Sequence, residues 1–495
     1  MAALRNLLGQ TAIYGVSSIV GRVMNFFILT PFYTRIFDKV EYGAITELYA
    51  YVAFLLVFLT YGMETAFFRF SSKEKSKAHL IFSTAAISLL TTSCMFIGLI
   101  YLSHQNIADF LGYSSSPEFI ILFGWIVAID TFVTLPFAQL RLQNKAVRFA
   151  SINLVSIVVN ITLNLFFFKY CPAAVEAEVS WVESFYEPSF GIGYVFVANF
   201  IASLAKLLLL LPTIAGIKTG FSPRVFKQLL PYGLPLLFLG LAGIVNETFD
   251  RAAFESLSGL PPDEAAAELG IYGACYKVAM LLSIGIQAYR FAAEPFIFSL
   301  SKGEKSDKVQ ADAMKYYFIS ALLICLTLIC FEDLSLLLIG EEFRVGAGVI
   351  PILLGAYLLY GAVFNLSFWY KLNDKTLYGA GIAFAGAAIT IALNVWLVPK
   401  MSYYGSAIAT LAAYAVMVVI SFALMRKYHP IAYDLKSIGI YLTLAALMVV
   451  AFKFAALDGG LKYVAGFICV GVFALFAFIK EKKLILSNDN RRNHK

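Results

Sequence analysis

Long apolar runs alternate with short charged or turn-forming segments along the whole chain. Each run extends over roughly 20 residues, the length that an α-helix needs to cross the hydrocarbon core of a bilayer. Every backbone polar group must be satisfied within the hydrocarbon, so runs of this length predict helices. We therefore expect about fourteen membrane-spanning helices, near residues 11–34, 44–68, 79–102, 117–140, 149–168, 190–213, 228–250, 270–297, 312–331, 347–370, 377–398, 404–425, 437–457 and 461–479.

The composition agrees with this pattern. Hydrophobic residues make up 60% of the chain and charged residues 14%, whereas soluble domains average roughly 45–50% apolar and 25% charged residues. A chain of 495 residues with this balance cannot cover its surface with polar groups in water. The predicted fold class is therefore an all-α polytopic membrane protein.

The Lys and Arg residues of the short loops predict the orientation. With the N-terminus in the cytoplasm, 26 of them fall on the cytoplasmic side and seven on the outside, as the positive-inside rule requires. Both termini are thus expected in the cytoplasm. The net charge of +7 is spread over many loops without a basic patch, so nucleic-acid binding is not expected.

Sequence motifs for catalysis and metal binding are missing. The six cysteines include no CxxC pair, and no HExxH, GxSxG or P-loop pattern occurs. A membrane-embedded glycan polymerase or acyltransferase would need catalytic groups clustered at one interface, often with His or a long outside loop, and neither is present. We expect a transporter and no enzyme, with no catalytic residues, metal site or cofactor. A coupling ion is the exception, and it could be a proton or sodium.

The two halves of the chain repeat each other. Tyr42-Gly43-Ala44 recurs as Tyr272-Gly273-Ala274, and residues 141–145 (RLQNK) recur as residues 371–375 (KLNDK), both at an offset of 230 residues. With six helices per half, the second half enters the membrane in the same sense, which is a parallel repeat suited to alternating access. The predicted domains are two six-helix lobes, residues 1–222 and 223–430, and then two helices with a basic tail, residues 431–495.

Residues 33–43 (YTRIFDKVEYG) close the first predicted span and open the second. They resemble the polysaccharide transporter branch of the multidrug/oligosaccharidyl-lipid/polysaccharide exporter superfamily, and residues 61–64 and 68–70 are similar to that branch as well. The resemblance implies two six-helix lobes arranged as a V. The branch of this superfamily with fourteen helices includes O-antigen and lipid II flippases, so the resemblance implies a flippase of this kind.

The resemblance also implies a substrate, a polyprenyl-pyrophosphate-linked oligosaccharide, and a place in the bacterial inner membrane. We expect a monomer whose partners are the lipid-linked glycan, membrane lipids, and the polysaccharide polymerase and glycosyltransferases of the same pathway. The drug-exporting relatives typically have twelve helices. A cation-coupled multidrug antiporter is therefore the alternative function.

Arg22 lies halfway along the first predicted span, on the same helical face as Ser18 and Asn25. A charge at this depth costs about 2.5–3.5 kcal/mol on insertion scales and usually faces a cavity or a partner. We interpret the polar stripe as a substrate-binding cavity wall in which Arg22 binds phosphate bidentately. The alternative is an ion pair of Arg22 with Glu64 or Glu247.

The eighth predicted span carries a second polar stripe, which includes Gln287, Arg290 and Glu294. We expect Gln287 and Arg290 to contact the substrate, together with Lys277 nearer the outer end. Arg290 and Glu294 are i,i+4 neighbours, so a structural ion pair is the alternative, and Lys277 could snorkel. In the lipid II flippases that the chain resembles, arginines of the first and eighth helices line a cationic cavity, which implies this role for Arg22 and Arg290.

Several acidic residues in or near the spans are candidates for gating or for binding a coupling ion. Glu247, Asp250 and Arg251 close the seventh span, where we expect a Glu247–Arg251 salt bridge, with gating as the alternative. Glu64 and Asp130 are candidates for binding a proton or sodium ion, and Glu294 belongs to the same group.

Two further polar features have simpler interpretations. Asn153, Asn160 and Asn164 share one face of the fifth span, which predicts interhelical hydrogen bonds or substrate contact. Lys206 and Lys453 lie near span ends, and we expect their side chains to snorkel to the interface.

Overall fold

The computed structural model describes residues 15, 19–215, 220–298, 304–455 and 457–493. In this part of the chain all regular elements are helices, and 13 of them are long and apolar enough to cross a membrane. The first predicted span begins outside the described residues. The predicted all-α polytopic fold with about 14 spans is confirmed.

The helices pack into two compact units, and three long helices contribute to both. These are α13 (Pro262–Phe298), α17 (Thr376–Met401) and α18 (Tyr403–Tyr428). The first unit comprises Met1–Gly273 and Thr390–Ser406, and the second comprises Ala274–Ile389 and Ala407–Lys495.

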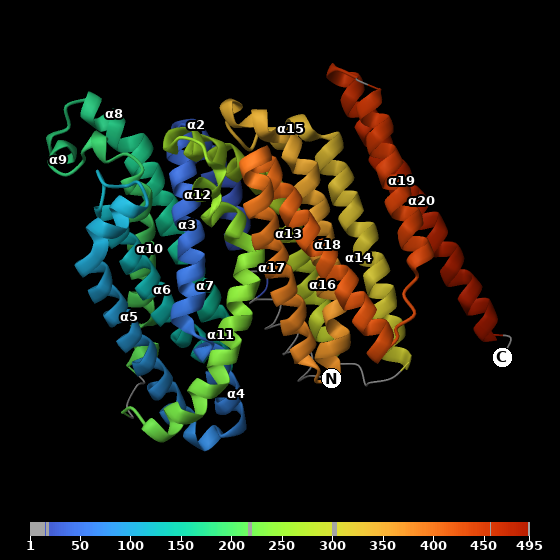
Figure 1. Ribbon diagram of the computed structural model, residues 1–495, viewed down its shortest axis with the longest axis horizontal. Coiled ribbons are helices and arrows are strands. Elements are labelled where there is room, and N and C mark those ends of the chain that lie inside the picture. The colour runs from blue at the N-terminus through green and yellow to red at the C-terminus, as the bar shows by residue number, and fades with distance from the viewer. Residues whose placement is uncertain (1–14, 16–18, 216–219, 299–303, 456, 494–495) are drawn as a thin grey trace. The chain divides into compact units, whose positions relative to one another are not determined.

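The first unit holds the helices coloured blue to light green in Figure 1. The described part of the first span ends in a π-helical turn, η1 (Asn25–Leu29), followed by α2 (Thr30–Ile36). The remaining elements are α3 (Lys39–Thr60), α4 (Met63–Lys73), η2 (Lys75–Lys77), α5 (Ala78–Phe110), α6 (Glu118–Leu142), α7 (Ala146–Leu165), η3 (Phe166–Tyr170), α8 (Cys171–Glu176), α9 (Ser180–Glu183), η4 (Pro188–Phe190), α10 (Gly193–Ile214), α11 (Pro223–Ala252) and α12 (Phe254–Ser258).

The second predicted span is broken between α3 and α4. Tyr61 and Gly62 both have left-handed backbone conformations, with φ of 32° and 70°. Tyr61 is an uncommon residue in this region, whereas glycine adopts it without steric cost. Gly62 also permits a close approach to α11, because a Cβ there would lie 2.4 Å from the carbonyl oxygen of Gly233.

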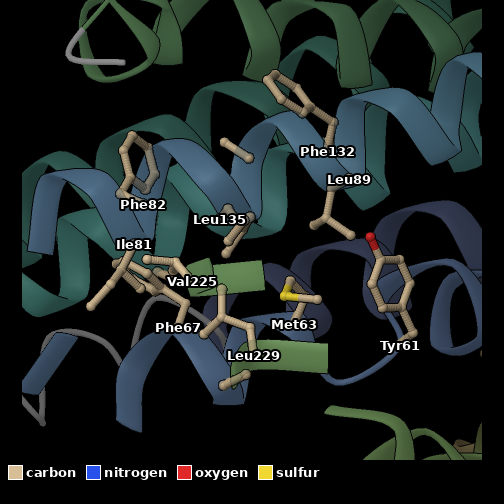
Figure 2. Close-up of a cluster of buried hydrophobic side chains, with 14 of the residues drawn as sticks. Tyr61, Met63, Phe67, Ile81, Phe82, Leu89, Phe132, Leu135, Val225 and Leu229 are labelled. Carbon is tan, nitrogen blue, oxygen red and sulfur yellow. The ribbon is translucent and has the colours of Figure 1, made fainter. Parts of the chain in front are cut away.

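An apolar core fills the space around this break. Figure 2 shows Met63 and Phe67 of α4 beside Leu89 of α5, Leu135 of α6 and Leu229 of α11, and these five side chains have no exposed surface. Between membrane helices such close packing stabilises through van der Waals contacts. The core therefore holds α4 in place despite the interruption of the helix before it.

Glycines bring the start of α13 against the start of α3 within the first unit. A Cβ on Gly43 would lie 1.9 Å from the backbone oxygen of Ala266, and one on Gly270 would lie 2.0 Å from that of Lys39. Small residues commonly permit such close contacts between membrane helices.

The second unit contains α14 (Glu304–Cys330), against which the last two helices pack. These are α19 (Leu435–Phe454) and α20 (Gly459–Asn493), drawn in red in Figure 1. The remaining elements are α15 (Glu332–Leu336), η5 (Glu341–Val349) and α16 (Ile350–Leu372).

Ion pairs connect α19 and α20 to neighbouring helices. Lys315 of α14 and Glu481 of α20 form a buried pair at 2.7 Å. Lys453 pairs with Glu332, and Lys462 pairs with Asp333 at the start of α15. The expectation that Lys453 snorkels to the interface stays a prediction, and the structure adds Glu332 as its partner.

The sequence repeat has a counterpart in the local structure. Asn144 after α6 and Asp374 after α16 both have positive φ, at 56° and 58°. In each turn the following lysine donates its N–H five residues back, Lys145 at 2.9 Å and Lys375 at 2.8 Å. The division into lobes 1–222, 223–430 and 431–495 stays a prediction, since the compact units follow contacts and the lobes follow the repeat.

Candidate substrate-binding and ion-coupling sites

Two ion pairs occupy equivalent positions in the repeat. Glu64 on α4 pairs with Arg141 on α6, and Glu294 on α13 pairs with Lys371 on α16 at 3.4 Å. The partners are 77 residues apart in both cases. Glu64 therefore pairs with Arg141 in place of Arg22, and Glu294 pairs with Lys371 in place of Arg290.

Arg290 is held by aromatic groups. Its guanidinium carbon lies 4.5 Å from the ring centroid of Phe364, and Nη1 donates to the hydroxyl of Tyr360 at 3.4 Å. No described carboxylate pairs with it. A stacked guanidinium keeps its charge and a fixed orientation, and the rest of its donors stay available.

Two other candidates, Gln287 and Lys277, lie on α13 as well. Gln287 and Lys277 are half-buried, like Arg290. The ammonium group of Lys371 lies 5.2 Å from the Phe364 centroid, so the ring that supports Arg290 also lies near a second cation.

Arg22 lies on the described part of the first span, one turn before η1. Its side chain is exposed, as is that of Asn25, the first residue of the π-helical turn. Among the described residues Arg22 has no hydrogen-bonding or ion-pairing partner. Ser18 lies outside the described residues. Single π-helical turns inside longer helices occur frequently at functional sites.

Asp130 on α6 pairs with Lys206 on α10 at 2.6 Å, with about a fifth of each side chain exposed. The expectation that Lys206 snorkels is wrong, because α6 presents a carboxylate to it within the unit. An ion bound by Asp130 would have to compete with this lysine.

Asp250 at the end of α11 is buried, with 3% of its surface exposed. Its Oδ2 accepts a hydrogen bond from the hydroxyl of Tyr272 at 2.6 Å, and Nε of Arg251 lies 3.9 Å from Oδ1. Arg251 Nη2 donates to the backbone carbonyl of Glu247 at 2.5 Å. This contact is to the backbone of Glu247, whose side chain is exposed, and the Glu247–Arg251 salt bridge stays a prediction.

Buried polar groups from α17 and α18 extend this site within the first unit. Thr390 donates to Asn246 Oδ1 at 3.1 Å, and Ser406 donates to Asn394 Oδ1 at 3.1 Å. Ser406 also lies 3.4 Å from the carbonyl oxygen of Asp250. The sequence analysis did not select Thr390, Asn394 or Ser406, because hydroxyl and amide groups occur in many membrane helices.

The repeat was the signal that could have found Asn394. The position 230 residues earlier is Asn164, which accepts from the Tyr33 hydroxyl at 2.8 Å and donates to the carbonyl of Asn160 at 2.8 Å. Asn394 donates to the carbonyl of Thr390 at 2.8 Å in the same way. The prediction of an interhelical hydrogen bond from the asparagine stripe is thereby confirmed for Asn164.

A second acidic site was missed by the sequence analysis. The buried carboxylate of Glu47 on α3 accepts from Tyr51 at 2.9 Å and from Tyr113 at 2.8 Å. Burial and the charge of Glu47 raise the pKa of Glu255, on α12 between two spans, to about 8. Glu255 is thus largely protonated at neutral pH.

A family model described as polysaccharide biosynthesis protein matches residues 7–301, more than half of the chain. The chain belongs to the polysaccharide biosynthesis protein family. This match confirms the family expected from residues 33–43. No curated protein matches the chain.

Solved transporter structures share the fold of this family member. A lipid II flippase MurJ in an inward closed conformation is similar with a TM-score of 0.73 and 13% identity, over 95% of this chain and 99% of that chain. An inward-facing multidrug resistance MATE family transporter of the MOP superfamily has a TM-score of 0.63 and 13% identity, over 83% and 100% of the chains. A MOP superfamily transporter from Pyrococcus furiosus has a TM-score of 0.52 and 12% identity, over 84% and 96%.

At sequence identities of 12–13%, the structural similarity to these transporters shows the fold. This member of the polysaccharide biosynthesis protein family is a multi-pass membrane protein with a transporter fold. The family match includes Arg22 and Arg290, whereas α14 to α20 lie beyond residue 301 and are covered by the structural likeness.

Proposed function

We propose that this protein is a flippase that moves a polyprenyl-pyrophosphate-linked oligosaccharide across the bacterial inner membrane by alternating access. Its membership in a polysaccharide biosynthesis family supports a glycan substrate. Its likeness to a lipid II flippase supports a lipid-linked one.

The pairing of charges within the spans is the observation that carries the proposal. Glu64, Asp130, Glu294 and Glu481 each have a Lys or Arg partner. Arg22 and Arg290 have no carboxylate partner among the described residues. At these two positions a positive charge has no counter-ion, which favours an anionic substrate such as a pyrophosphate.

Arg22 and Arg290 would hold the pyrophosphate, because a guanidinium matches two phosphate oxygens at once. Ser18, Asn25, Gln287 and Lys277 would supply further contacts to the phosphates or the first sugars. The polyprenyl chain would stay in lipid along α19 and α20, whose apolar side chains are widely exposed, as Leu447, Phe467 and Phe478 show with 61%, 70% and 65%.

A coupling ion would bind at an acidic group. Asp250 is a strong candidate, since its Oδ1 is buried without a hydrogen bond and neutral oxygens of α17 and α18 lie nearby. Glu64, Asp130 and Glu294 lie closer to their basic partners than Asp250 Oδ1 lies to Arg251, and would first have to release them. Glu247 and Arg251 would act in gating, since they lie next to Asp250 at the end of α11.

A cation-coupled multidrug antiporter remains the second candidate. The fold likeness to a multidrug MATE family transporter favours it, as does the buried carboxylate of Glu47, whose described partners are the neutral hydroxyls of Tyr51 and Tyr113. A cationic drug would, however, be repelled by Arg22 and Arg290.

Flipping of a fluorescent polyprenyl-pyrophosphate oligosaccharide in proteoliposomes tests the proposal. We expect transport by the wild type and its loss in Arg22→Ala and Arg290→Ala. Lys400→Ala is the matched control, because Lys400 also stacks on an aromatic ring, Trp396, at 4.5 Å. Export of cationic dyes without any flipping would favour the antiporter.

The inner-membrane location with both termini cytoplasmic is part of the proposal. So are the monomeric state and the partnership with a polysaccharide polymerase and glycosyltransferases. Labelling of single cysteines placed at the two termini with a membrane-impermeant maleimide in whole cells tests the orientation, and no labelling is expected.

A further inference from the structure

Four aromatic rings gather where α7 ends and the α8–α9 segment begins, at one end of the first unit (Figure 1). Neighbouring ring centroids lie 5.4–6.4 Å apart, and their planes are inclined by 8–32°. This aromatic cluster consists of Phe166, Tyr170, Trp181 and Phe185.

The cluster faces away from the protein. Tyr170, Trp181 and Phe185 are 48%, 53% and 47% exposed, large fractions for rings of this size. On the opposite side of the same segment, Val182 and Tyr186 are buried against the core of the unit. One face of the segment therefore packs on the helices, and the other presents aromatic rings outward.

The exposed rings continue a stripe on α7. Exposed apolar side chains recur along this span at spacings of seven, four and seven residues, which places them on one helical face. They are Val147, Leu154, Val158 and Leu165. A stripe of this kind on a membrane span faces lipid, so the aromatic cluster lies directly beyond a lipid-facing surface.

Charged residues mark the depth of the cluster. Lys169, one turn after Leu165, is exposed, and lysines near span ends reach toward the headgroups. Glu176, Glu178 and Glu183 beyond it are exposed as well. The aromatic rings thus lie between an apolar surface and an acidic one, which is the level where Trp and Tyr concentrate in membrane proteins.

We propose that the aromatic cluster anchors the α8–α9 segment in the headgroup layer of the bilayer, on the outer side in the predicted orientation. Half-exposed rings there bury apolar surface in the interface, while the Trp181 N–H and Tyr170 O–H reach polar headgroups. The anchor fixes the depth of α7. Sugar rings are the competing occupant of such a surface, and continuity with the lipid-facing stripe favours lipid.

Tryptophan fluorescence in proteoliposomes tests the anchor. The chain has four tryptophans, so the contribution of Trp181 is the emission lost in Trp181→Phe. Phosphatidylcholine brominated at carbons 6 and 7 should quench that contribution more than phosphatidylcholine brominated at carbons 11 and 12. Acrylamide in the aqueous phase should quench it weakly.

Trp396→Phe gives the reference for a tryptophan on a membrane span, since Trp396 is 58% exposed on α17. A second variant, Trp125→Phe/Trp396→Phe, retains Trp181 and the fully buried Trp369, so the quenching of its emission reports on Trp181. Strong acrylamide quenching of Trp181 without lipid quenching would overturn the anchor. So would a shift of its emission on adding a soluble oligosaccharide, which would identify a glycan surface.

Discussion

Glu64 on α4 forms an ion pair with Arg141 on α6, across 77 residues of sequence. The guanidinium of Arg141 also lies 5.1 Å from the ring centroid of Phe68. The repeat-related residues Glu294 and Lys371 form the same pair on α13 and α16. In both halves the same ion pair therefore fixes the helix that carries the glutamate.

Removing one member of this pair should leave a charge without a partner in a membrane span. We expect Glu64→Gln and Arg141→Gln each to lower the apparent melting temperature in detergent, by an amount equivalent to about 1 kcal/mol, since both side chains are about one-third exposed. The double variant should be no less stable than either single variant.

The exposed pair of Glu74 and Lys77 is the control for this cycle, and its coupling should be smaller. Additive losses in the Glu64 and Arg141 variants would show that the two side chains do not stabilise each other.

The shape of Arg290 should matter as well as its charge. Lysine at this position keeps the charge but loses the planar stacking on Phe364 and the donation to Tyr360. We expect Arg290→Lys to weaken binding of a soluble pyrophosphate-bearing lipid analogue roughly tenfold, and Arg290→Ala more strongly, since hydrogen bonds to charged groups contribute about 1.5–3 kcal/mol. Titration of the purified protein by microscale thermophoresis measures both. Equal affinities in the wild type and Arg290→Ala would exclude Arg290 from the binding site.

Stability should depend on pH through Glu255. Burial and the charge of Glu47 raise its pKa from 4.5 to about 8, so the folded protein binds this proton more tightly than the unfolded chain. Stability is therefore expected to fall as the pH rises from 4.5 to about 8, and to lose no more above that. Glu255→Gln should remove this loss and raise the melting temperature at alkaline pH, with little effect near pH 4.5.

Glu264→Gln, at an exposed position of α13, is the matched control and should leave the pH profile unchanged. An identical profile for the wild type and Glu255→Gln would contradict the raised pKa.

A methyl group at Gly43 should disrupt the contact of α3 with α13. The added Cβ would lie 1.9 Å from the backbone oxygen of Ala266, and backbone cannot move aside as a flexible side chain can. We expect Gly43→Ala to lower the melting temperature by several degrees or to reduce the yield of monodisperse protein in gel filtration. Gly98→Ala in α5 meets nothing within 4 Å and should be neutral or slightly stabilising, because alanine is favoured in helices by about 1 kcal/mol. A wild-type melting temperature and yield for Gly43→Ala would mean that α3 and α13 can move apart at this contact without loss of stability.

The sequence by itself determined the properties that depend on local pattern. The length and apolarity of the runs predict the membrane helices, because hydrocarbon forces each run to satisfy its own backbone hydrogen bonds. Residues 141–145 and 371–375 predict the repeat, and their matching turns at Asn144 and Asp374 follow from short-range conformational preferences. Residues 33–43 were enough to indicate the family.

Only the tertiary structure decided which charged and polar groups meet. Arg141 was a cytoplasmic loop charge in the sequence analysis, Lys206 an interfacial lysine, and Glu47 was not selected at all, yet each has a partner at least 66 residues away or on another helix. An apolar span tolerates many rotations about its axis and shifts along it. The rotation and depth that bring two side chains within hydrogen-bonding distance are set by packing against neighbouring helices, and no local pattern contains that information.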